Sequence, residues 1–322
     1  MNQATEMVIQ TRGLSKSFGK VQALQGLDLA VPKNSILGFL GPNGAGKTTT
    51  MKLLLGLIRP TSGSGTIFGQ DIVRESVSIR TRIGYLPQQP RFIDSMTARE
   101  TLRFAASFFF DGPKAGIEQR IDEMLELVGL EDKAGRPVKG FSGGERQRLG
   151  LAQAQINYPD LLILDEPAAA LDPIGRHEVL AVMEHLRQHA TIFYSTHILD
   201  DVQRISDTVV ILNHGKLVAQ GSIDQLLNGS GKVVYTVTLK GNTEAGYGRI
   251  AGQAWVSEVD VAQRNGTTTW QVSVTDETKA EAQLFRLLAT DERMIVTGFN
   301  RKKYELEEVF MNIVRGEKDA QQ

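Results

Sequence analysis

Eight residues near the start of the chain have the composition and order of a phosphate-binding loop. Residues 41–48 read GPNGAGKT and fit the pattern G-x-x-x-x-G-K-[ST], between the apolar run SILGFL and a helical pattern. The glycines allow the backbone to point N–H groups inward, and the N-terminus of the following helix adds a partial positive charge. Lys47 can reach the outer phosphates of a nucleotide, and the Thr48 hydroxyl can bind Mg²⁺. The residues that we expect around the phosphates are Gly41, Pro42, Asn43, Gly44, Ala45, Gly46, Lys47, Thr48 and Thr49.

A second apolar run ends on two adjacent carboxylates. Residues 161–164 read LLIL and precede Asp165 and Glu166. A buried strand would deliver Asp165 to its C-terminal edge, where the Mg²⁺ lies, and Glu166 could accept the proton of an attacking water. The alternatives are a glycine-rich turn before an ordinary helix and a solvated pair of acids that ends a strand. Both features in one chain favour the nucleotide site.

Strands and helices must alternate to position these residues. Besides residues 35–40 and 161–164, the runs TIFYS at 191–195 and TVVIL at 208–212 are candidates for buried strands, with helical patterns between them. This alternation predicts a mostly parallel sheet covered by helices. Residues 97–156 are almost wholly helical in pattern and indicate an inserted helical lobe.

The pattern changes after the turn signal NGSG at residues 228–231, which we expect to be a linker. The strand-like runs VVYTVTLK, QVSVT and MIVTGF follow it, together with the helix-like runs KAEAQLFRLLA and YELEEVFMNIV. We therefore expect a small C-terminal α+β domain at residues 232–315. It contains no catalytic motif that we recognise.

The composition excludes several classes of site. The 322 residues contain 36 Lys+Arg and 37 Asp+Glu, and this balance argues against nucleic acid as a partner. Cysteine is absent, which excludes disulfides, thiolate zinc sites and cysteine nucleophiles. The N-terminus lacks the pattern of a signal peptide, and no apolar run approaches the ~20 residues that span a bilayer. We expect a soluble chain that can act at a membrane only through a partner.

A second candidate anion site begins with the segment FSGGERQRLGLAQA at residues 141–154, where a Ser-Gly-Gly turn opens a helix. A phosphate-binding loop, this turn, an acid strand and a later histidine, in that order, resemble the ATP-binding cassette ATPases. The resemblance covers about residues 7–227 and implies ATP and Mg²⁺ as cofactors. It implies an α/β fold of the P-loop NTPase type, with a RecA-like core, an antiparallel β lobe and a helical lobe at about residues 90–157. The ATP-binding domain would occupy residues 7–228.

The family's site residues correspond to matching positions of this sequence. Phe18 resembles the aromatic residue that stacks on adenine, with a core residue of the β lobe as the alternative. Gln88 resembles the glutamine that contacts the metal and the attacking water, with Gln89 as the alternative. His197, after a predicted strand, resembles the histidine that contacts the γ-phosphate, although a lone histidine is usually structural. The resemblance implies as catalytic residues Glu166, His197 and Gln88, and as metal ligands Thr48, Gln88 and Asp165.

The resemblance also implies that a second chain completes each site. Ser142, Gly143 and Gly144 would contact the γ-phosphate held by a partner subunit, and Asp172 would lie at the interface. ATP then joins two ATP-binding subunits, identical or related, and hydrolysis releases them.

Four residues depart from the usual pattern. Phe141 and Glu145 replace the usual Leu and Gln of the signature, and an acid near the partner's phosphates is unfavourable unless it is turned away or paired. Ala168 and Ala170 replace a Thr and a Gly after the acid pair, and Ala restricts the backbone wherever φ must be positive. These departures leave open a rival function, an ATP-binding switch with weak hydrolysis that regulates a non-transport assembly.

A single cassette without a long coiled-coil insertion favours a transport subunit over the translation-factor and DNA-repair classes. The chain resembles the single-cassette ATPases of bacterial multidrug- and antibiotic-type exporters, whose integral-membrane permease is a separate chain. The resemblance implies an ATPase that drives export, cytoplasmic and held at the inner face of the cell membrane by the permease. A soluble ATPase that serves nucleic acid is a third hypothesis.

Four phenylalanines, Phe104, Phe108, Phe109 and Phe110, lie in the helical segment TLRFAASFFF. Aromatic clusters are usually buried, so the first interpretation is a core of the helical lobe. The second is an apolar groove that receives a short cytoplasmic helix of the permease. Both can hold, because successive residues of a helix cannot all face inward.

Overall fold

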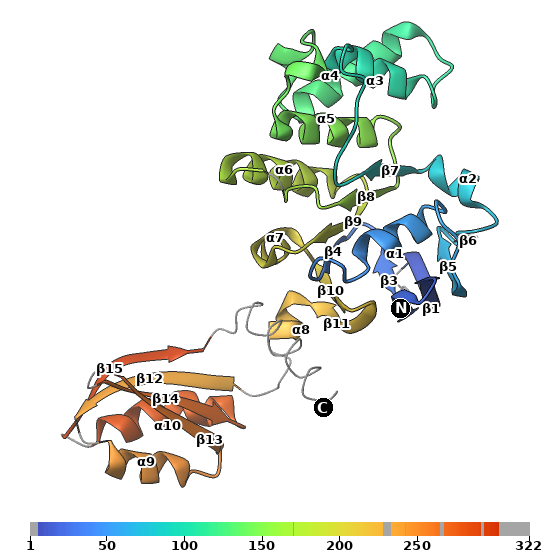
Figure 1. The fold of residues 1–322 in the computed structure, drawn as a ribbon. Coiled ribbons are helices and arrows are strands. Elements are labelled where there is room, and N and C mark those ends of the chain that lie inside the picture. Colours follow the sequence, from blue (N-terminus) through green and yellow to red (C-terminus); the bar gives the residue numbers. More distant parts are fainter. Residues whose placement is uncertain are drawn as a thin grey trace. The chain divides into compact units, whose positions relative to one another are not determined.

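The computed structural model describes residues 6–302 except residues 170, 228–232, 242, 265, 266, 291 and 292 (Figure 1). The chain divides into two compact units, whose described parts lie within residues 6–223 and residues 224–302. The predicted linker at residues 228–231 and the predicted helix YELEEVFMNIV lie outside the described residues.

A six-stranded sheet forms the centre of the first unit (Figure 1). Its order is β11-β10-β4-β9-β8-β7, and the five strands from β10 to β7 run parallel, whereas β11 is antiparallel to β10. The central strands are buried throughout, which is typical of a parallel sheet with both faces covered. The strands are β4 Ile36–Leu40, β7 Ile83–Leu86, β8 Leu161–Asp165, β9 Thr191–Thr196, β10 Thr208–Asn213 and β11 Lys216–Ser222. Helices of this part are α1 Lys47–Leu54, α2 Ser76–Arg80, α6 Pro173–Leu186 and α7 Leu199–Ile205.

A second, antiparallel sheet forms the β lobe. Its order is β2-β1-β5-β6, with β3 paired to β1. Ile9 and Leu14 of this sheet share one buried apolar cluster with Met51 of α1, so the lobe is packed onto the core of the unit. The strands are β1 Met7–Phe18, β2 Val21–Leu27, β3 Ala30–Pro32, β5 Ser62–Ile67 and β6 Gln70–Asp71.

A helical lobe with its own apolar cluster lies between β7 and β8 in the sequence. Leu102, Ile121 and Leu149, one from each of its α-helices, are fully buried there. The elements are α3 Ala98–Ala106, α4 Lys114–Leu127 and α5 Gly143–Gln155, with the 3-10 helices η1 Glu131–Lys133 and η2 Val138–Gly140. The predicted α/β fold with a β lobe and a helical lobe is thus confirmed.

The second unit is a small α+β fold. A four-stranded antiparallel sheet of order β13-β14-β12-β15 packs its apolar side chains, with Trp270 fully buried, against Leu284 and Leu288 of a helix. The elements from the end of the first unit onward are α8 Ile223–Leu227, β12 Val233–Gly241, α9 Glu244–Ala251, β13 Val256–Arg264, β14 Thr267–Val274, α10 Glu277–Ala289 and β15 Met294–Arg301. Across the described parts of the chain, no helix combines the length and hydropathy needed to cross a membrane.

Gly84 of β7 leaves no room for a side chain. A Cβ at this position would lie 1.9 Å from the carbonyl oxygen of Ala154 in α5. We expect Gly84→Ala to force the strand and the helix apart and to lower the free energy of unfolding by about 3 kcal/mol, measured by chemical denaturation. In Gly116→Ala, the matched control in α4, the new Cβ meets nothing within 4 Å, so stability should stay equal or rise slightly. Equal stabilities of the two variants would contradict the contact.

Candidate active site

The phosphate-binding loop joins the end of β4 to the start of α1. Two of its glycines approach other backbone segments closely. Gly46 has a φ of +106°, and a Cβ there would lie 2.5 Å from the carbonyl oxygen of Ala23. A Cβ on Gly41 would lie 2.4 Å from the carbonyl oxygen of Leu212. The shape of the loop therefore depends on glycine at both positions.

The loop lines a cleft of about 360 Å³, a volume within the range of small-molecule sites. Gln88 and Glu166, which are distant in the sequence, line the same cleft, whereas Gln89 does not. The structure therefore brings two of the predicted catalytic residues to the loop and favours Gln88 over its neighbour. The lining residues are Ala23, Pro42, Asn43, Gly44, Ala45, Gly46, Lys47, Thr48, Thr49, Gln88 and Glu166.

Lys47 is buried within the loop. Its Nζ donates to the carbonyl oxygen of Gly41 at 2.6 Å and lies 3.2 Å from Oε1 of Glu166. An ammonium group has three donors, so phosphate oxygens can replace the carbonyl as acceptors without a change of charge on the side chain. The predicted phosphate ligand and the predicted base thus form an ion pair.

Two of the three predicted metal ligands, Thr48 and Asp165, are in direct contact. Thr48 Oγ1 donates to Asp165 Oδ2 at 2.8 Å, and Ser195 Oγ donates to Asp165 Oδ1 at 2.6 Å. Hydroxyl and carboxylate oxygens are ligands that Mg²⁺ prefers, and nucleotide phosphates supply further oxygens. With Gln88 on the same cleft, the donor set fits Mg²⁺ bound together with a nucleotide.

Glu166 lies between Lys47 and His197. Glu166 is 5% exposed. Its Oε2 lies 2.9 Å from Nδ1 of His197, and its Oε1 contacts Lys47. The φ of Glu166 is +51°, in the left-handed region that residues other than glycine rarely adopt. Backbone strain of this kind is concentrated at functional sites. The predicted base, histidine and lysine therefore form one connected group beside the cleft.

The Ser-Gly-Gly turn begins α5 with a reciprocal cap. Glu145 N donates to Ser142 Oγ at 3.2 Å, and Ser142 N donates to Glu145 Oε2 at 2.7 Å. Lys133 Nζ donates to Glu145 Oε1 at 2.6 Å, and this hydrogen bond is the main reason why the pKa of Glu145 lies below its usual range despite burial. Glu145 is therefore paired with Lys133 and held in the cap. This pairing is the condition under which we expect an acid to be tolerated near a partner's phosphates.

Phe18, at the end of β1, is 51% exposed, and Nζ of Lys16 lies 5.0 Å from the centre of its ring. The alternative interpretation of Phe18 as a core residue of the β lobe is therefore wrong. Its contact with adenine stays a prediction. Neither Phe18 nor the turn of Ser142 is among the residues that line the cleft.

Two residues that contact predicted site residues are not predicted from the sequence: Lys133, which pairs with Glu145, and Ser195, which bonds to Asp165 and Glu166. Lys133 carries no motif, and the only signal for Ser195 is its position two residues before the predicted histidine. Asp172, which we expect at a subunit interface, is the N-cap residue of α6 and accepts a hydrogen bond from Gly175 N at 2.9 Å. Ala168 is buried, and Ala170 lies outside the described residues.

The phenylalanines at the end of α3 are mostly exposed. Phe104, Phe108 and Phe109 have exposed fractions of 50%, 70% and 44%, so the interpretation as a lobe core is wrong for these three. Phe110 is partly buried and packs against the apolar cluster of the lobe, in agreement with that interpretation.

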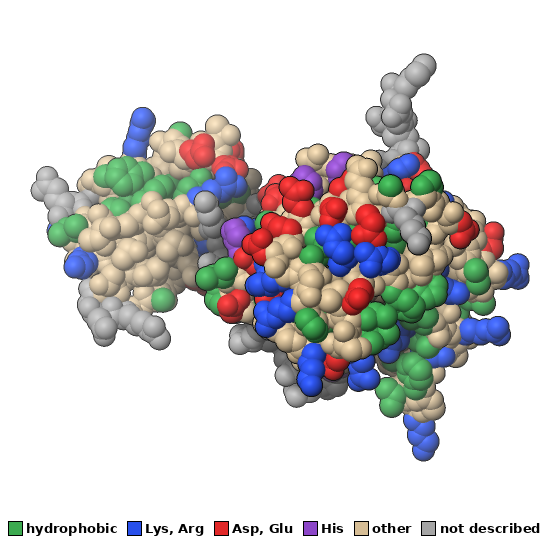
Figure 2. Space-filling model, turned by 90° about the horizontal axis from the view of Figure 1, so that it is seen from above, with side chains coloured by type: hydrophobic (Ala, Val, Ile, Leu, Met, Phe, Trp, Pro, Cys, Tyr) green, Lys and Arg blue, Asp and Glu red, His purple; other side chains and the backbone are tan. Residues whose placement is uncertain are grey.

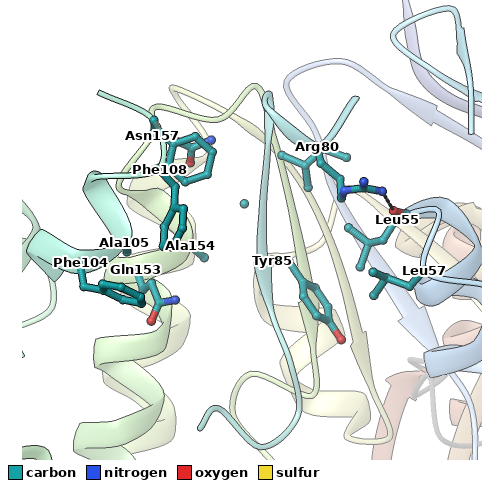
Figure 3. A pocket seen from close by; sticks show the side chains of 13 residues that line it. Leu55, Leu57, Arg80, Tyr85, Phe104, Ala105, Phe108, Gln153, Ala154 and Asn157 are labelled. Atoms are coloured by element: carbon teal, nitrogen blue, oxygen red, sulfur yellow. Dashed lines mark hydrogen bonds between the residues drawn. The ribbon is translucent and has the colours of Figure 1, made fainter. Parts of the chain in front are cut away.

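The exposed phenylalanines line a groove of about 320 Å³. Figure 3 shows Phe104 and Phe108 on one wall, with Leu55 and Leu57 on the other. Tyr85 lies in the groove, and burial, with a smaller contribution from the charge of Asp165, raises its pKa to about 12. The groove is therefore apolar and aromatic, with a hydroxyl that stays protonated at neutral pH.

Charged side chains of both signs are interspersed on the face of the first unit shown in Figure 2. In the helical lobe, opposite charges form ion pairs, including Arg99 with Asp122 at 2.5 Å and Arg103 with Glu118 at 2.5 Å. This face does not present the continuous basic surface that nucleic acid binding requires.

Residues 24–169 match the family model described as ABC transporter. Over 311 residues, 95% of this chain and 99% of the other, the sequence is 37% identical to the ABC transporter ATP-binding protein YxlF of Bacillus subtilis (strain 168). It is 43% identical to the bacitracin transport ATP-binding protein BcrA of Bacillus licheniformis, over 68% of this chain and 71% of that one. It is 36% identical to the Nod factor export ATP-binding protein I of Ralstonia nicotianae, over 68% of each chain. Among solved structures, cbiO1 of Clostridium perfringens, part of the ABC transporter complex cbiONQ, shares 26% identity at a TM-score of 0.64, over 70% of this chain and 92% of that one.

The pair of Lys133 and Glu145 predicts a pH-dependent stability. Because the pKa of Glu145 in the folded chain is below the usual 4.5, the pair stabilises the fold above that pH, and its contribution is lost as the pH falls through the folded-state pKa. Glu145→Gln should therefore lower the midpoint of thermal unfolding at about pH 7 and change it much less at about pH 3. Lys133→Met should behave in the same way, whereas Lys139→Met, at an exposed lysine, should not. A midpoint difference that is the same at both pH values would contradict this account.

Proposed function

Since this chain belongs to the ABC transporter ATP-binding proteins, we propose that it hydrolyses Mg-ATP, dimerises on ATP and drives a separate membrane permease for export. The observation that carries the proposal is the group of Lys47, Glu166 and His197 beside the cleft, together with the hydrogen bond from Thr48 to Asp165. These residues supply a phosphate ligand, metal ligands and a general base for ATP hydrolysis. A group that only bound nucleotide would not need a buried carboxylate held against a histidine at the cleft.

In the proposed reaction, the loop and Lys47 bind the β- and γ-phosphates, and Lys47 exchanges the carbonyl of Gly41 for phosphate oxygens. Bound Mg²⁺, with Thr48 and Asp165 as its protein ligands, would neutralise charge on the phosphates. Glu166 accepts the proton of the attacking water, and His197 orients the carboxylate from its other side. Gln88 lies on the cleft, where it can bind the water or the metal.

A second ATP-binding subunit completes the proposed site. Ser142 and the two glycines after it begin α5, whose N-terminus can bind an anion, yet they do not line the cleft of their own chain. A partner that brings this turn to the γ-phosphate would close the site. We propose an identical or a related chain as this partner, because the turn of Ser142 is absent from the lining of the cleft in its own chain.

The groove beside α3 is the proposed docking site for the permease. Its exposed phenyl rings and leucines form an apolar concave surface of the kind that receives a short amphipathic helix. The related cbiO1 is part of a transporter complex, and one relative is a Nod factor export protein, which supports a permease partner and an export direction. The chain would then lie at the inner face of the cell membrane.

Glu166→Gln tests the hydrolytic part of the proposal. The variant should bind ATP and dimerise on it, detected by analytical ultracentrifugation, while the turnover of ATP falls by about 100-fold or more because the general base is lost. Glu178→Gln on the exposed face of α6 is the control and should keep wild-type turnover. If the wild-type chain binds ATP but releases no phosphate even with its partner, the ATP-binding switch without transport is the better function.

Substitutions in the groove test the permease part. Phe104→Ala with Phe108→Ala should weaken binding to the proposed permease by about tenfold, since aromatic anchors dominate such interfaces. Turnover of ATP by the isolated chain should stay within about twofold. Phe285→Ala in the second unit removes a phenyl ring of the same 50% exposure as Phe104 and should leave binding unchanged. Unchanged binding by the groove variant would remove the groove as the docking site.

A further inference from the structure

We propose that Ser195 is a positioning residue for hydrolysis, because its hydroxyl holds both carboxylates of the site in place. This inference rests on the proposed function, in which Glu166 is the base and Asp165 a metal ligand. Ser195 is not among the residues that line the cleft, so it would act only through these two acids.

The hydroxyl of Ser195 uses its donor and an acceptor at the same time. Its Oγ donates to Asp165 Oδ1 at 2.6 Å and accepts from the backbone N of Glu166 at 2.9 Å. Ser195 is fully buried on β9, directly opposite Asp165 in the pairing of β8 with β9. Water cannot readily replace a hydroxyl at such a position, so both acids depend on this side chain for these hydrogen bonds.

The hydrogen bond between Ser195 and the backbone of Glu166 affects where the Glu166 carboxylate points. Successive side chains of a strand point to opposite faces, yet Asp165 and Glu166 must both serve the same cleft. The left-handed φ of +51° ends the strand geometry at Glu166, whose carboxylate then contacts Lys47 and His197. The backbone N–H of Glu166 donates to the hydroxyl of Ser195 in this uncommon conformation. Ser195 therefore stabilises the backbone conformation that directs the Glu166 carboxylate toward Lys47 and His197.

The bond to Asp165 orients the second acid. Ser195 donates to Oδ1, while Oδ2 accepts from Thr48, another of the predicted metal ligands. The carboxylate plane is thereby fixed with Oδ2 toward the phosphate-binding loop. An aliphatic residue at position 195 would fill the same strand position but leave Asp165 Oδ1 and the N–H of Glu166 without these partners.

The test is the steady-state kinetics of Ser195→Ala in the full chain. We expect kcat for ATP to fall by about tenfold, a part of what a general base contributes, while KM and the affinity for ATP stay within about threefold. A Glu166→Gln chain with the same Ser195→Ala change should still bind ATP and dimerise on it. Loss of ATP binding together with kcat would mean that the variant damages the whole site and would overturn the positioning role.

Thr191→Val is the matched control on the same strand. Thr191 is fully buried, and its hydroxyl accepts from the backbone N of Asn34 at 2.9 Å, another residue with left-handed φ, of +56°. The variant thus loses an equivalent hydrogen bond without touching the acids, and its kcat should match the wild type although its unfolding midpoint falls. An equal loss of kcat in both variants would show a general effect of destabilisation and would overturn the inference.

The two proposals can fail separately. If the wild-type chain shows no ATP hydrolysis with its partner, the proposed function fails, and Ser195 has no reaction to support. If the wild type hydrolyses ATP and Glu166→Gln abolishes turnover, while Ser195→Ala keeps kcat within about twofold, only the positioning role of Ser195 is overturned.

Discussion

The site depends on three parallel strands that end at the same edge of one sheet. β9 lies between β4 and β8, with Leu40 paired to Thr196 and Asp165 paired to Ser195. The carboxyl ends of parallel strands are where α/β proteins bind ligands, because the loops that leave them meet there. The phosphate-binding loop follows β4, the acids end β8, and His197 follows β9. A shift of β9 by one residue would move Ser195 and His197 to the wrong faces together.

Within this frame, the interactions are local and strongly coupled. Lys47 and His197 both contact the carboxylate of Glu166. Asp165 accepts hydrogen bonds from the hydroxyls of Thr48 in α1 and Ser195 in β9. Buried charges are stable only when they are paired and hydrogen-bonded, which these contacts provide. The same burial makes the group sensitive to single substitutions, since any member that is removed leaves another polar atom without its partner.

Most of the fold and the cleft could be predicted because phosphate chemistry requires contiguous patterns. The loop of Gly41 to Thr48 and the strand before Asp165 are each readable within a few residues. Ser195 and Lys133 could not be predicted, because their partners are set by strand pairing and helix packing across long sequence distances. The phenylalanines near the end of α3 could be predicted only in part. Aromatic residues are buried on average, which describes the partly buried Phe110, whereas the alternative of an apolar groove describes Phe104 and Phe108.

The helix α5 links two surfaces for which different partners are proposed. Its N-cap is Ser142 of the Ser-Gly-Gly turn, and Gln153 and Ala154 in its last turn line the groove, so about 16 Å of helix separates Ser142 from Gln153. At the groove end, Gly84 allows the backbones of α5 and β7 to pack directly against each other, so the helix cannot move closer to the strand there. A helix of this length is stiff, so its two ends must tilt as one body. A displacement of the groove end of α5 would therefore change the orientation of the Ser142 cap at its other end. This coupling needs no separate chain of side-chain contacts.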